Sequence, residues 1–382
     1  NSAVGLRSMP ARYLFLDEVD GYPLDVEGEG DAISLAEARG LAELPHQARM
    51  MAALESRDLL DRKVEFLPPA EVLAEREARG EPLTRAEIGV LLAYAQLTLF
   101  SDLVASDLPD DPHFRHDLIA YFPAQMHRKY AGEIDGHRLR REIVATELAN
   151  DLVNRGGPTL ISRLTDVSGR PAADVAAAYA VVRGGFDLPA LYAAIDALDN
   201  RIDGKAQLDL YAGVGRLIDR TTAWILKNEP EIGSIGDGIS ALAKARAAVE
   251  PELDRLLPPY LAGKVAETRD GFAKLGTPVQ LAERLAGLAA VELLPDIALA
   301  ASQAKAGLKP TAKAFFGVGD AFRIDRMEDA AHGIRPADYY EGLALLHAAD
   351  MIGAARRDIA CAVLREASSV EKWLEKAGDR IA

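Results

Sequence analysis

The chain has 382 residues, of which 49% are hydrophobic and 27% are charged. This is enough apolar material for a folded core and too much for a disordered chain. The formal net charge of −15 argues against binding to nucleic acid or anionic lipid, because both need clustered Lys and Arg. The composition therefore predicts a cytoplasmic protein with neither a nucleic-acid nor a membrane partner.

The N-terminal segment, residues 1–32, is predicted to be irregular, with a tag remnant at its start. Residues 13–16 (Tyr-Leu-Phe-Leu) are the best strand candidate, in a hairpin with residues 24–26. Residues 25–31 imitate the start of a calcium loop, but Ala36 stands where the bidentate glutamate belongs. We interpret this stretch as an acidic turn.

Helix signals recur from Ser34 to the end of the chain. Thr84 and Glu87 form a capping-box pattern, and Leu83 and Ile88 are spaced as a hydrophobic staple. The helix that they start, over residues 84–105, is apolar nearly all round. It is therefore predicted to be central, and its longest apolar stretch is too short to cross a bilayer, which takes about 20 residues.

Later helices are predicted at residues 137–155 and 205–226, each with an apolar stripe at helical spacing. Gly156 and Gly157 end the first of them, and Thr277 with Pro278 is expected to cap another helix. The predicted stripes are Leu139, Ile143, Leu148 and Leu152 in the first helix, and Leu210, Val214, Leu217 and Trp224, widened by Tyr211, Ile218 and Ile225, in the second.

The fold class predicted from these patterns is all-α, with multi-helix packing and at most the one short hairpin. Residues 228–238 are rich in Gly, Pro and acidic side chains, which is typical of a linker. We therefore expect two helical subdomains, at residues 33–229 and 230–382.

Two glycine pairs, Gly213 with Gly215 and Gly317 with Gly319, resemble part of a dinucleotide-binding fingerprint. Each lacks the third glycine and follows no predicted strand, so close helix packing is the favoured interpretation. Cys361 is the single cysteine and lies in an apolar run, which favours a buried side chain over a nucleophile.

Metal binding has two candidates in the sequence. His113 and His116 are three residues apart on a predicted short helix, but a zinc site needs a third protein ligand. Glu43 and His46 have Glu-x-x-His spacing, but no second pair exists and Pro45 interrupts the helix. Surface residues are the favoured interpretation for the histidine pair, and the Glu43–His46 pair is discounted as a metal site.

A row of polar side chains lies beside the apolar stripe of the helix at residues 137–155. Thr146, Asn150 and Asn154 recur at every fourth position, and buried Asn is costly without a partner. We predict a polar seam that pairs helices or contacts a partner. Its candidate residues are Arg141, Thr146, Asn150, Asp151, Asn154 and Arg155.

Five stretches carry a resemblance to a known family: residues 83–97, 105–112, 148–159, 197–200 and 370–374. In this order they resemble the C-terminal region of the large bacterial NAD-specific glutamate dehydrogenases. The resemblance runs from about Ser34 to the end, and the residues before about Asp31 depart from it. It implies a helical, noncatalytic part of a longer enzyme that converts glutamate and NAD to 2-oxoglutarate, ammonium and NADH.

In that family the glutamate-binding lysine motif and the dinucleotide fold lie in a separate dehydrogenase domain, so no catalytic, cofactor-binding or metal residue transfers to this chain. The resemblance implies NAD for the parent enzyme and none bound here. Its expected partners are the dehydrogenase domain and other subunits of a homo-oligomer. Two alternatives stay open: a free-standing helical binding module, and a small metal-dependent helical enzyme using His113 and His116.

Overall fold

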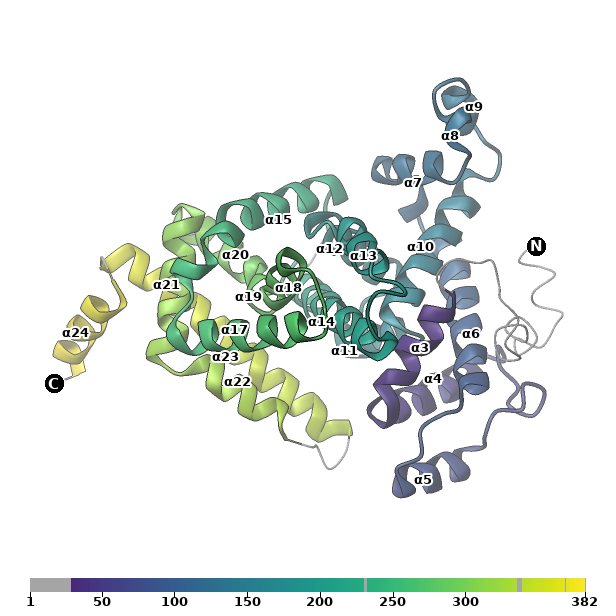
Figure 1. Ribbon diagram of the computed structural model, residues 1–382, viewed down its shortest axis with the longest axis horizontal. Coiled ribbons are helices and arrows are strands. Elements are labelled where there is room, and N and C mark those ends of the chain that lie inside the picture. Colours follow the sequence, from purple (N-terminus) through teal and green to yellow (C-terminus); the bar gives the residue numbers. More distant parts are fainter. Residues whose placement is uncertain (1–28, 230–231, 335–338, 368, 382) are drawn as a thin grey trace. The chain divides into compact units, whose positions relative to one another are not determined.

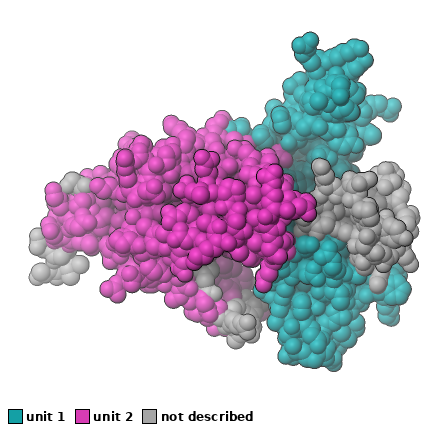
Figure 2. All heavy atoms as spheres, in the orientation of Figure 1, with its two compact units in different colours: residues 1–180, 225–236 teal, residues 181–224, 237–382 magenta. Residues whose placement is uncertain are grey.

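The computed structural model describes residues 29–229, 232–334, 339–367 and 369–381. The fold class is all-α, as predicted, and no strand occurs among the described residues (Figure 1). The predicted hairpin and most of the calcium-like loop lie outside these residues. Contacts divide the chain into two compact units, each described by itself (Figure 2). The subdomain boundary inferred from the sequence stays a prediction.

Unit 1 comprises residues 1–180 and 225–236. Its core lies where α6 packs on α10 and α3. Short 3₁₀ turns at Gly40–Glu43, Leu108–Asp110 and Pro112–Phe114 connect its helices. The helices are α3 (Glu29–Arg39), α4 (Leu44–Ser56), α5 (Ala70–Arg79), α6 (Arg85–Val104), α7 (Arg115–Ala120), α8 (Ala124–His127), α9 (Ala131–Asp135), α10 (Arg140–Gly156) and α11 (Leu160–Ser168).

Unit 2 comprises residues 181–224 and 237–382, and its core lies between α20, α21 and α23. A 3₁₀ turn at Glu250–Glu252 precedes α16. The helices are α13 (Leu188–Asp196), α16 (Leu253–Leu256), α17 (Pro259–Lys274), α18 (Val279–Ala286), α19 (Leu288–Val291), α20 (Leu294–Ala304), α21 (Leu308–Ala321), α22 (Ile324–His332), α23 (Tyr339–Glu366) and α24 (Val370–Ile381).

Three helices contribute residues to both units: α12 (Ala172–Gly185), α14 (Gly204–Asn228) and α15 (Ile235–Val249). The predicted apolar stripe of α14 is buried except at Trp224, which is half-buried. The last four residues of the predicted linker are helical, because α15 begins at Ile235.

The capping box that starts α6 is confirmed. Thr84 accepts a hydrogen bond from the backbone N–H of Glu87, and the Glu87 carboxylate accepts one from the backbone N–H of Thr84. α6 and the bent pair of α18–α19 with α20 are long and apolar enough to suit a membrane span. Half of the apolar window of α6 is buried inside the structure, as in a core helix. The whole 20-residue helix thus meets the length criterion that its uninterrupted apolar stretch alone does not.

Two local predictions are wrong. Leu139 is exposed rather than part of the buried stripe, because it precedes the first turn of α10. Thr277 caps no helix: α18 begins at Val279 with Pro278 as its N-cap residue, and the Thr277 side chain is buried. The predicted stop of α10 is confirmed, since the helix ends at Gly156 and Gly157 takes a left-handed φ of +85°.

Candidate functional site: a charged network in unit 2

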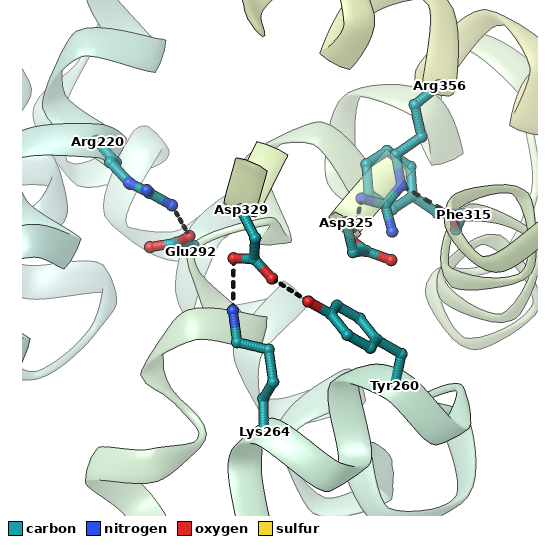
Figure 3. A network of polar contacts seen from close by, with 8 residues as sticks. All are labelled: Arg220, Tyr260, Lys264, Glu292, Phe315, Asp325, Asp329 and Arg356. Carbon is teal, nitrogen blue, oxygen red and sulfur yellow. Dashed lines mark hydrogen bonds and ion pairs between the residues drawn. The ribbon is translucent and has the colours of Figure 1, made fainter. Parts of the chain in front are cut away.

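Helix α22 contributes two acids to a network of polar contacts in unit 2 (Figure 3). Two of its acids, Asp325 and Asp329, are four residues apart and therefore one turn apart along the helix. Asp325 reaches α23, whereas Asp329 reaches α17. The helix thus connects two neighbours through two separate polar contacts.

The contact with α23 is a buried ion pair. The side chain of Arg356 is 1% exposed and that of Asp325 is 7% exposed, with 2.9 Å between Nη1 and Oδ1. Arg356 Nε also donates to the Phe315 carbonyl on α21 at 3.1 Å, and the guanidinium lies 4.3 Å from the centre of the Phe315 ring. One side chain therefore links three helices through charge, a hydrogen bond and a cation–π contact.

Gly319 on α21 provides the space that this guanidinium occupies. A Cβ at position 319 would lie 2.2 Å from Arg356 Nη2 and 2.9 Å from Asp325 Oδ2. A Cβ at Gly317 would lie 3.1 Å from Val370 on α24. Close packing, the interpretation favoured for this glycine pair, is confirmed.

Neither glycine pair fits a dinucleotide. Phosphate binding needs a glycine-rich turn that leads into a helix and points backbone N–H groups at the ligand. Gly213 and Gly215 lie inside α14, and Gly317 and Gly319 lie inside α21, where the backbone N–H groups belong to the helix ladder.

The contact with α17 is more exposed. Tyr260 donates its hydroxyl to Asp329 at 2.6 Å, and Lys264 forms an ion pair with the same carboxylate. The hydrogen bond to Asp329 raises the pKa of Tyr260. Arg326 lies 4.7 Å from the centre of the Tyr260 ring. The lysine and aspartate side chains are 48% and 36% exposed, so water screens their attraction.

Two further acids extend the network. Glu292, just after α19, forms an ion pair with Arg220 on α14. Burial raises the pKa of Glu292, while the Arg220 charge opposes the rise. Burial also raises the pKa of Glu328, against the opposing charges of Arg356 and Arg220. Glu328 is thus coupled electrostatically to both arginines.

The chemistry of this network favours a structural role. Arg220 pairs with Glu292, and Arg356 pairs with Asp325, within the described residues. Arg356 Nη2 is buried and has no hydrogen-bond partner among them. A catalytic base would need reach to a substrate proton, and the Asp325 carboxylate is instead buried against Arg356.

The structure places the predicted polar seam on α10 in unit 1, and three of its members form contacts with other segments. Arg141 forms an ion pair with Asp110 and donates to the carbonyls of Val104 and Ser106 at 3.1 and 2.7 Å. The two remaining contacts are Asp151 accepting from Tyr179 at 2.8 Å and Asn154 accepting from Gln96 at 2.9 Å.

The remaining members of the seam are Thr146, Asn150 and Arg155. Thr146 is exposed, and its hydroxyl donates a hydrogen bond to the Glu142 carbonyl of its own helix at 2.7 Å. Asn150 and Arg155 are half-buried. The contacts of Asp151 and Asn154 join α10 to α12 and α6, while the proposed partner contact of the seam stays a prediction.

The metal candidates, His113 with His116 and Glu43 with His46, have the following surroundings. His116 is 89% exposed, and the backbone N–H of His113 donates to Asp111 at 2.8 Å. Glu43 accepts a hydrogen bond from Thr159. No group of three or more His, Cys, Asp or Glu side chains suited to a metal ion occurs in the part of the chain that the structure describes. Cys361 is buried as predicted, and burial raises the pKa of its thiol.

The network itself was missed at the sequence level. Asp325 and Arg356 are 31 residues apart, and local patterns do not give the register between separate helices. One sequence feature could have pointed to the network. Arg356 and Arg357 follow the nearly uncharged residues 342–355 and precede the buried residues Ala360 and Cys361. Arg357 also forms an ion pair, with Asp296 on α20.

Fold and network together define an all-α protein whose buried charges hold helices to one another. The family model "Glutamate dehydrogenase, C-terminal" matches residues 80–382, and the chain belongs to this family. A second model, the ATPase domain of the phage terminase large subunit gpA, matches residues 1–54. The chain has no Gly-x-x-x-x-Gly-Lys-Ser/Thr phosphate loop, and the second match carries no functional argument here.

Three curated relatives are each an NAD-specific glutamate dehydrogenase. The Pseudomonas aeruginosa protein is 36% identical over 293 residues, which cover 77% of this chain and 18% of the relative. The Halomonas elongata protein is 33% identical over 296 residues (78% and 18%), and the Mycobacterium tuberculosis protein is 30% identical over 366 residues (94% and 22%). The chain thus spans about a fifth of the length of these relatives.

Proposed function

We propose that this chain is the noncatalytic helical part of an NAD-dependent glutamate dehydrogenase, and that it serves assembly and stability. In the complete polypeptide, glutamate, NAD⁺ and water give 2-oxoglutarate, ammonium, NADH and a proton. The observation that carries this proposal is the family match over residues 80–382, combined with coverage of about a fifth of each relative.

The geometry supports the noncatalytic assignment. The glycine pairs lie within helices, and the two arginines Arg220 and Arg356 form ion pairs with carboxylates. NAD is proposed for the parent enzyme, bound outside this chain. The proposed partners are the dehydrogenase domain and the other subunits of a homo-oligomer, and the proposed location is the cytoplasm.

The proposal is tested by expressing the native polypeptide that contains this chain and following NADH formation from L-glutamate and NAD⁺. We expect turnover that depends on both substrates. A native reading frame without a dehydrogenase segment, or a folded complete polypeptide without this activity, would overturn the proposal in favour of the free-standing binding module.

A further inference from the structure

The first four turns of α23 expose large apolar side chains. The exposed fractions are 77% for Tyr340, 55% for Leu346 and 60% for Met351. With Leu343 they fall within one half of the helix surface by register, and we call these four residues the outer face of α23. Aromatic residues and Met are enriched at protein interfaces, whereas Lys and Glu are depleted there.

The opposite side of the same turns is apolar as well. Leu345, Ala349 and Ile352 share the register of the buried Arg356 and are half-buried. Between residues 342 and 355 the only formally charged side chain is that of Asp350. A helix that is apolar all round is typically buried. The sequence of these turns is therefore typical of a helix that is covered by other parts of the protein on both sides.

Helix α17 provides a comparison within unit 2. None of its residues is buried, and it is therefore an ordinary surface helix. Five charged side chains are distributed over its 16 residues: Lys264, Glu267, Arg269, Asp270 and Lys274. The side of α23 that holds the outer face carries a single formally charged side chain, Asp350, beside His347. It is therefore much poorer in charge than α17, and exposure alone does not explain its composition.

The buried network fixes the helix that carries this face. Arg356 ties α23 to α21 and α22, and Arg357 ties it to Asp296 on α20. A helix held in this way presents its side chains in a fixed arrangement, which lowers the entropy lost on docking.

We propose that the outer face of α23 docks against the dehydrogenase part of the same polypeptide; this inference rests on the proposed function. The chain covers only 18–22% of its relatives' length. In a parent of that size, about four-fifths of the residues lie outside this chain and are covalently linked to it. Tethering gives these residues a high effective concentration at the face.

The first test is oxidative footprinting of the native full-length enzyme by hydroxyl radicals and mass spectrometry. Met351 is 60% exposed and Met327, on α22, is 46% exposed, so Met327 serves as the internal reference. If the face is covered, Met351 is oxidised several-fold more slowly than Met327. Oxidation of Met351 at or above the Met327 rate overturns the proposal.

The second test identifies the occupant by photocrosslinking in the full-length enzyme with Leu346→benzoylphenylalanine. Val279→benzoylphenylalanine is the matched control, because Val279 is 65% exposed at the start of α18. Mixed subunits of light and heavy isotopic composition separate crosslinks within one polypeptide from those between subunits. The expected product joins position 346 to the dehydrogenase part of its own polypeptide.

Every other crosslinking outcome overturns the proposal. A crosslink to another subunit assigns the face to oligomer assembly, and a crosslink within residues 1–382 assigns it to this chain itself. Absence of a crosslink at position 346, with normal yield of folded enzyme, leaves the face open to solvent. NADH formation by the same enzyme tests the proposed function independently, so the two failures are distinguishable.

Discussion

Two of the acids of α22, Asp325 and Asp329, form ion pairs in opposite environments. Asp325 pairs with Arg356 where both side chains are almost fully buried, whereas Asp329 pairs with Lys264 and Tyr260 near the surface. A buried pair is costly to break because the remaining charge loses its partner without gaining water. The difference predicts that breaking the α22–α23 ion pair lowers stability more than breaking the α22–α17 ion pair does.

The largest expected effect comes from Arg356→Met, which leaves the Asp325 carboxylate buried and uncompensated. We expect the free energy of unfolding, measured by urea denaturation, to fall by about 3–5 kcal/mol. Adding Asp325→Leu to this variant removes the unpaired charge and should restore much of the loss. A loss as small as that of a surface pair would contradict the contrast between the two contacts.

Gly319→Ala should cost less, about 1–3 kcal/mol, because the new methyl group overlaps the Arg356 guanidinium. The matched control is Gly263→Ala in α17, where no atom lies within 4 Å of the added Cβ. The control should gain up to about 1 kcal/mol from helix propensity. Equal thermal unfolding shifts of the same sign for both variants would rule out the proposed role of Gly319.

Glu328 makes stability depend on pH in a defined direction. Burial raises its pKa in the folded state above the ordinary value of 4.5, so the folded chain binds the proton more tightly than the unfolded chain. The stability contributed by protonated Glu328 is fully present below pH 4.5 and is lost as the pH rises through the pKa of Glu328 in the folded state. Relative to Glu328→Gln, the unmodified chain should gain stability as pH falls from neutral toward 4.5.

Calorimetry of both proteins across this pH range measures the effect. A difference between them that does not change with pH would show that burial does not perturb this carboxyl group.

The smallest effect is expected for Lys264→Met, which removes the exposed charge from Asp329. Double-mutant cycles on exposed pairs give about 0.2–1 kcal/mol, and added salt should reduce the effect further. The same urea denaturation as for Arg356→Met measures it. A loss matching that of Arg356→Met would mean that exposure does not separate the two contacts.

Local sequence signals predicted the parts of this fold that depend on neighbouring residues. The Thr84–Glu87 capping box, the stop at Gly156 and the buried faces of α10 and α14 follow from spacing along one helix. The error at Thr277 has a local cause, since Pro278 is followed by a helix that begins one residue later than expected.

The charged network could not be predicted in this way. Whether Arg356 is buried or solvated depends on Asp325, Phe315 and Gly319, which lie on two other helices. The sequence did single out Gly317 with Gly319 and favoured close packing, but it did not show which side chain fills the space. Pairing across helices depends on packing geometry, which hydrophobic periodicity does not encode.

The proposed noncatalytic role is tested most directly with the purified 382-residue chain. Circular dichroism first establishes that it is folded and helical, and the chain is then mixed with L-glutamate and NAD⁺ and titrated with NADH. We predict no NADH formation and no NADH binding by this chain, under conditions in which the complete polypeptide turns over. Substrate-dependent NADH formation by this chain alone would contradict it.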